Sequence, residues 1–181
     1  MTECDQASLY NPRDERDSCG FGLIAQLDDH PSRATVDAAL EALARMTHRG
    51  GVAADGLSGD GCGLLLKHPE RFLRTLADEA GIALGVQFAA GLVFLPQDEA
   101  EAAHCRGTLR SALAEVQLAV AGWRLLPVDA DACGATARAN LPRIEQVFVA
   151  PAVDADHAQA APETFRRALF LARRRASQRV Q

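Results

Sequence analysis

The sequence predicts one domain of mixed helices and strands. Its 181 residues suffice for a single compact core, and 48% of them are hydrophobic. Segments with the apolar pattern of strands alternate with segments of helical periodicity. This order is typical of a parallel, doubly wound sheet, but antiparallel sheets stacked face to face would give the same order. Periodicity alone therefore leaves the two architectures open.

The first expected elements are a strand and an amphipathic helix. GFGLIAQL, at 20–27, is an apolar run that predicts a mostly buried strand. The turn that follows offers Ser32 as a helix N-cap, and the helical pattern continues until the pair Gly50-Gly51 ends it. A glycine-rich loop over 50–63 comes next, and its glycines permit positive φ angles or a close approach of the backbone to a bound group.

The remainder of the chain alternates between helices and strands. Pro69 suits the first turn of one helix, Pro96 closes the strand before the next helix, and acidic residues after Asp98 favour a helix start there. We expect helices over 69–80, 98–116 and 163–180, and strands over 86–96, 118–128 and 144–151.

Composition indicates a cytoplasmic protein without membrane or nucleic-acid partners. The formal net charge is -5, no apolar run is long enough to span a membrane, and residues 1–18 lack the features of a secretory signal. The last helix nevertheless has a basic face, which leaves nucleic-acid binding as an alternative to a solvated helix or an intersubunit contact. That face comprises Arg166, Arg167, Arg173, Arg174, Arg175 and Arg179.

Two further patterns argue against metal and nucleotide sites. The five cysteines are widely spaced and form no Cys-x-x-Cys pair, so neither a disulfide framework nor a zinc knuckle is indicated. For the adjacent pair His104 and Cys105 we favour a helix surface over a metal site. The sequence SGDGCG, at 58–63, matches neither the P-loop nor the dinucleotide pattern, and we expect a structural loop.

Cys19 can be a nucleophile or a buried core residue. A thiol attacks as the thiolate, and the α-amino group of an N-terminal cysteine can accept its proton because the two pKa values are close, about 8 and 8.5. This chemistry requires removal of residues 1–18. Gly20 and Gly22 would then leave room for a substrate. From the residues alone, a structural cysteine is the commoner alternative.

Several sequence blocks together resemble a known family. LYNPRDERDSCGFGLIAQL, ALARMTHRGGVAADGLSGDGCGLLL, LPRIEQVFV and FRRALFLARRR resemble the class II glutamine amidotransferase domain that begins the large subunit of bacterial glutamate synthase. The resemblance spans about Leu9 to Arg175. It implies an α+β fold of four layers, αββα, the N-terminal nucleophile hydrolase fold. It also implies a leader, 1–18, cut from a catalytic domain, 19–181, between Ser18 and Cys19.

The resemblance implies a glutaminase. Cys19 would attack the side-chain amide of glutamine, release ammonia and leave a thioester for water to hydrolyse. Arg49 resembles an arginine beside the nucleophile's backbone, with a surface arginine at a helix end as the alternative. We expect His48 to be structural. In the same loop, Asp55, Asp60 and Cys62 are expected to shape the pocket.

The resemblance also implies what lies outside this domain. In the complete large subunit, the ammonia would form glutamate from 2-oxoglutarate with FMN and an iron-sulfur cluster, and a small NADPH-dependent subunit would be a partner. We expect no cofactor or metal within 19–181. The family's oxyanion-hole Asn-Gly pair has no match, since Asn11 and Asn140 precede Pro and Leu. We therefore expect a truncated domain of low activity, with a non-catalytic assembly or binding module as the alternative.

Overall fold

The computed structural model describes residues 20–46, 51–59, 61–152 and 161–180. The chain divides into two compact units. The first unit comprises Met1–Leu65 together with Gly134–Thr136, and the second comprises Leu66–Cys133 together with Ala137–Gln181. Both helices and strands occur among the described residues, so the prediction of mixed content is confirmed.

A three-stranded antiparallel sheet forms the centre of the second unit. Its strands are β1 (Ala89–Leu95), β2 (Leu118–Leu125) and β3 (Arg143–Pro151), in the order β1-β3-β2. Both outer strands run against β3, and the ladder between β2 and β3 shifts register between Val120 and Gly122. A parallel, doubly wound sheet is therefore wrong for this unit, because the central strand opposes both of its neighbours.

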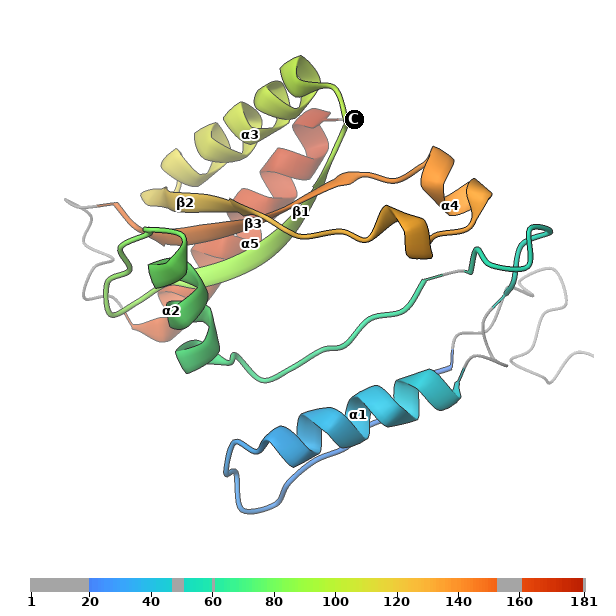
Figure 1. Ribbon diagram of the computed structural model, residues 1–181. Coiled ribbons are helices and arrows are strands. Elements are labelled where there is room, and N and C mark those ends of the chain that lie inside the picture. Colours follow the sequence, from blue (N-terminus) through green and yellow to red (C-terminus); the bar gives the residue numbers. More distant parts are fainter. Residues whose placement is uncertain (1–19, 47–50, 60, 153–160, 181) are drawn as a thin grey trace, which may run out of the picture. The chain divides into compact units, whose positions relative to one another are not determined.

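Helices pack on both faces of this sheet (Figure 1). They are α2 (Glu70–Glu79), α3 (Glu99–Ala114) and α5 (Pro162–Val180). Val147 and Val149 of β3 pack in one core cluster with residues of α3 and α5. Phe148, between them in sequence, packs with α2 on the opposite face. Alternate residues of a strand point to opposite faces, so β3 contributes to two separate cores.

Local sequence explains where α3 begins. The Asp98 side chain accepts a hydrogen bond from Glu101 N at 2.9 Å, and acidic residues in the first turn interact favourably with the helix dipole. Between β2 and β3 lie two short elements that the sequence pattern did not predict. They are the 3-10 helix η3 (Ala130–Ala132) and the helix α4 (Ala135–Ala139). Both are too short to show a helical hydrophobic period.

The first unit contains the predicted amphipathic helix, α1 (Arg33–Arg45). Ser32 caps it as expected, accepting a hydrogen bond from Thr35 N at 3.2 Å. The buried strand expected over 20–27 is wrong, because these residues are exposed and form no strand in the described part of the chain. An apolar run becomes a strand only where another strand completes its hydrogen bonds. Of the described helices, none combines the length and apolarity that crossing a membrane requires.

Candidate functional site

The structure describes some of the site residues that the sequence predicts and leaves others outside the described ranges. Cys19 and Arg49 lie outside the described residues, as do His48 and Asp60. Gly20 is described, and it is exposed and outside regular secondary structure. Most of the glycine-rich loop that follows Arg49 is described, and it gives the candidate site its geometry.

Residues 52–59 of this loop form a closed turn. Val52 and Gly59 are paired in an antiparallel bridge. Inside the bridge, Ala53 N donates to Ser58 O at 2.8 Å, and Gly56 N donates to Ala53 O at 2.9 Å. Gly56 has a φ of 70°, in the left-handed region that glycine adopts most readily. The expectation that the loop glycines permit positive φ is confirmed at this position.

The Asp55 carboxylate holds this turn together. Its Oδ1 accepts hydrogen bonds from Leu57 N at 3.1 Å and from Ser58 N at 2.8 Å. Its Oδ2 accepts from Ser58 Oγ at 2.6 Å and from Thr136 N at 3.1 Å. The Ser58 hydroxyl, followed by these backbone donors, holds the pKa of Asp55 well below its usual range, since hydrogen bonds to a carboxylate favour its charged form.

A buried glycine completes the contact. A Cβ on Gly134 would lie 2.5 Å from Ser58 Oγ and 2.6 Å from Asp55 Oδ2, closer than real Cβ contacts allow. Glycine at 134 therefore lets the backbone of 134–136 approach the carboxylate. The sequence pattern did not reveal Gly134 and Thr136, which lie about eighty positions after Asp55. The sequence signal at this position is a single glycine directly before a short alanine-rich segment.

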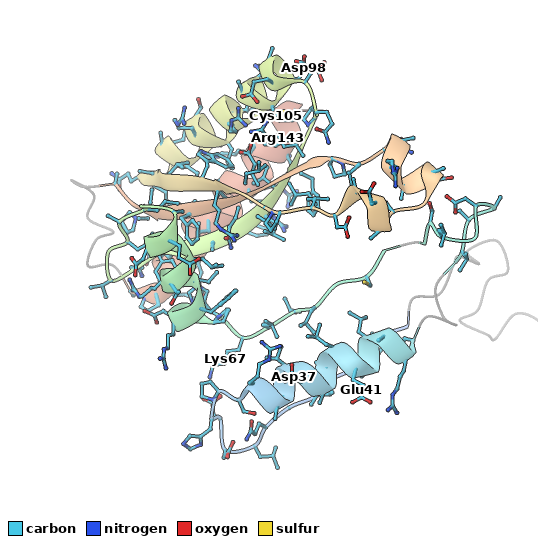
Figure 2. The ribbon with its side chains drawn as sticks, viewed as in Figure 1. Asp37, Glu41, Lys67, Asp98, Cys105 and Arg143 are labelled. Atoms are coloured by element: carbon cyan, nitrogen blue, oxygen red, sulfur yellow. The ribbon has the colours of Figure 1, made fainter. Side chains whose placement is uncertain are left out.

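The other residues singled out by sequence lie on the surface. Cys62 is exposed. His104 is exposed, and Cys105, which is labelled in Figure 2, is half-buried on α3. Both line a shallow groove with Pro96 and Val180. Within the described ranges, no three His, Cys, Asp or Glu side chains are grouped in a way that could hold a metal ion.

Among the residues that the structure describes, three of the six arginines on the basic face of α5 form ion pairs with acidic residues. Arg175 and Arg179 both contact Glu115, at 3.2 and 2.7 Å, and Arg166 contacts Glu163 at 3.7 Å. These pairs are partly or largely exposed. The basic face is thus partly neutralised by acids of the same chain, as expected for a solvated amphipathic helix.

Comparison with known proteins identifies the family. The family model for class-II glutamine amidotransferases matches residues 19–181. The chain belongs to this family, which confirms the resemblance inferred from the sequence blocks around Cys19 and Arg49.

Its relatives are glutamate synthases. The chain is 36% identical over 177 residues to the large chain of the NADPH glutamate synthase of Azospirillum brasilense, covering 97% of this chain and 11% of the relative. It is 40% identical over 145 residues to ferredoxin-dependent glutamate synthase 1 of Arabidopsis thaliana, covering 79% and 9%. The NADH glutamate synthase of Saccharomyces cerevisiae is 33% identical over 183 residues, covering 97% and 8%. The chain thus spans about a tenth of the length of these relatives.

Proposed function

We propose that this chain is the glutaminase part of a glutamate synthase. It hydrolyses the side-chain amide of glutamine and supplies the ammonia from which glutamate is formed on 2-oxoglutarate. The observation that carries this proposal is the family match over 19–181, which begins at the cysteine that the chemistry requires. The similarity to glutamate synthases from a bacterium, a plant and a yeast supports glutamate formation as the use of this ammonia.

The proposed nucleophile is Cys19, after removal of residues 1–18. The freed α-amino group accepts the thiol proton, because the unperturbed pKa values of about 8 and 8.5 make the transfer nearly balanced. The thiolate attacks the amide carbon of glutamine, and the C–N bond breaks as the amine returns the proton to the departing ammonia. A γ-glutamyl thioester remains, and water hydrolyses it to glutamate and the free thiol.

Two neighbouring residues support this chemistry in the proposal. Gly20 follows the nucleophile directly and is exposed, so no Cβ stands between a substrate and the backbone there. Arg49 holds the backbone of the nucleophile. It lies two positions before the loop residue Gly51, so the conformation of the loop limits where Arg49 can lie.

We also propose the four-layer αββα arrangement of N-terminal nucleophile hydrolases. An antiparallel sheet with α3 and α5 on one face supports this proposal, because it has the make-up of one α layer next to one β layer. On the face that α2 partly covers, Leu92 and Phe94 are 53% and 64% exposed. They share this face with Ala90, which packs in the α2 cluster. An apolar strip on a sheet face is the kind of surface against which a second sheet packs.

The complete protein is proposed to be cytoplasmic and to contain FMN and an iron-sulfur cluster outside residues 19–181. Its proposed partners are glutamine, the other domains of the large subunit and a small NADPH-dependent subunit. The relatives named above use NADPH, ferredoxin or NADH, so the similarity of this domain does not select the electron donor.

The test is glutamine hydrolysis by the protein as its gene encodes it, measured as ammonia release. Cys19→Ala removes the attacking atom, and we expect activity to fall at least about 1,000-fold. Cys105→Ala, which changes a half-buried free thiol on α3 in the second unit, is the matched control and should keep full activity. Full activity in Cys19→Ala contradicts the proposal. No hydrolysis by the wild type favours the alternative, a non-catalytic assembly or binding module.

A further inference from the structure

The Asp55 carboxylate connects two segments of the first unit that are far apart in sequence. Oδ1 bonds within its own turn, to Leu57 N and Ser58 N. Oδ2 bonds both to Ser58 Oγ and to Thr136 N, 81 positions away. One oxygen therefore shapes the turn, and the other ties the turn to the segment 134–136.

We propose that Asp55 is a positioning residue that holds the glycine-rich loop against Gly134–Thr136 in the conformation that binds glutamine. This inference rests on the proposed glutaminase function. It adds the contact between Asp55 and Thr136, which the sequence pattern did not reveal. Asp55 itself contacts protein donors, so it acts through the loop that follows Arg49 and not on the substrate.

The close fit at Gly134 argues that this contact is specific. Three atoms, Ser58 Oγ, Asp55 Oδ2 and Ser58 N, lie 2.5 to 2.7 Å from where a Cβ on Gly134 would stand. Ser58 is itself buried, with 5% of its surface exposed. A serine hydroxyl, a carboxylate and a glycine backbone are therefore packed with no space for one additional methyl group.

The contact bears on the loop next to Arg49 for a reason of chain connectivity. The bridge between Val52 and Gly59 closes the turn, and Gly51 precedes that bridge by one residue. Holding the turn at Thr136 thereby fixes the chain two residues after Arg49. If the link breaks, fewer molecules have the binding conformation at any moment. The apparent KM then rises in inverse proportion to that fraction, while saturating glutamine restores kcat.

Asp55→Asn separates the two functions of the carboxylate. The amide oxygen can replace Oδ1 and keep the bonds to Leu57 N and Ser58 N. The amide nitrogen then stands at Oδ2, where it faces the N–H of Thr136 and cannot accept its hydrogen bond. Flipping the amide would place two donors against Leu57 N and Ser58 N instead. The substitution therefore keeps the local turn and removes the long-range bond.

The experiment measures kcat and KM for glutamine in the full protein. We expect Asp55→Asn to raise KM about tenfold and to leave kcat within about twofold, as for the loss of one hydrogen bond to a charged group. The matched control is Asp129→Asn, because Asp129 accepts a local bond from Asp131 N at 3.0 Å in the second unit. It should leave both constants unchanged. Gly134→Ala should also raise KM, because its Cβ would push the segment 134–136 away from Asp55.

Hydrogen exchange tests the link independently of activity. The amide of Thr136 should exchange faster in Asp55→Asn than in the wild type, whereas those of Leu57 and Ser58 keep their acceptor, and unchanged exchange at Thr136 overturns the inference. A fall in kcat at constant KM also overturns it, since a merely structural role reduces the amount of folded enzyme. If Cys19→Ala keeps full activity or the wild type hydrolyses no glutamine, the proposed function fails, and exchange at Thr136 still decides whether the link exists.

Discussion

Arg106 of α3 donates a hydrogen bond from Nη1 to Oε1 of Glu145 on β3 at 2.8 Å, across 39 positions of sequence. Arg143, at the start of β3 and labelled in Figure 2, donates from Nε to the same oxygen at 2.5 Å. Both arginines also pair with Glu99. Two cations and two carboxylates thus fix the N-terminal half of α3 over the beginning of the central strand.

Removing the charge of Glu145 should destabilise the protein. Its side chain is 4% exposed and that of Arg106 is 16% exposed, so Glu145→Gln removes the buried one of the two carboxylates that pair with a mostly buried guanidinium and leaves only the exposed Glu99. We expect a loss of about 3 kcal/mol in the free energy of unfolding, measured with urea. Glu99 is 64% exposed, and Glu99→Gln is the control, with an expected loss below about 1 kcal/mol. Equal losses in the two variants would contradict this account.

A side chain at Gly122 should disturb the core below α2. A Cβ there would lie 2.6 Å from Cγ1 of Ile82. Ile82 is buried, with 7% of its surface exposed. We expect Gly122→Ala to lower the unfolding free energy by about 1–3 kcal/mol. Gly91→Ala is the matched control, because its Cβ would meet Val147 at an ordinary 3.9 Å, and a change within about 0.5 kcal/mol is expected.

The same clash can be tested by a double-mutant cycle. Ile82→Ala removes the atoms that the new methyl group meets, so Gly122→Ala should be less destabilising in that background than in the wild type. Strictly additive losses would show that crowding against Ile82 is not the cause.

Lowering the pH should reduce the free energy of unfolding partly through protonation of Asp55. Its pKa in the folded chain is held below its usual range, whereas the unfolded chain has a pKa of about 3.9. The unfolded state therefore binds the proton more readily, and the stabilisation present above about pH 4 is lost as the pH falls further. Unfolding free energies measured from pH 7 to 3 should decline less steeply below pH 4 in Asp55→Asn. Parallel profiles would refute this assignment, and Asp129→Asn serves as the control.

Processing at Cys19 predicts a particular N-terminus. If the α-amino group of Cys19 is the base, the intact mass of the active protein should correspond to a chain that begins at Cys19. A protein that hydrolyses glutamine with residues 1–18 still attached would exclude this base. An inactive protein that retains Met1 is the outcome expected of an assembly module.

Most regular elements could be predicted from the sequence. The patterns for α2, α3 and α5 and for the three strands agree with the structure to within a few residues at each end. These segments have a clear apolar period together with caps or prolines at their ends, which are local signals. The segment 20–27 has a strand-like composition and forms no strand in the structure, since pairing is not a local property.

The candidate site was only partly accessible to sequence reasoning. The sequence singled out Asp55 as a member of a glycine-rich loop, and the structure adds the bonds to Ser58 and Thr136 that give this carboxylate a defined place. Gly134 could not be found, because the need for glycine arises from atoms of a segment that is distant in sequence. Cys19 and Arg49 remain predictions of the sequence and of the family match.

The sequence by itself determined the family and the order of the longer helices and of the three strands of the sheet, and it supplied the proposed nucleophile. These follow from local periodicity, capping residues and motif blocks, which depend on residues close together in the chain. Only the tertiary structure decided that β3 lies between β1 and β2, that Glu145 meets Arg106 and that Gly134 faces Asp55. Each of these depends on which distant segments come into contact, and packing and hydrogen bonding across the whole fold select those contacts.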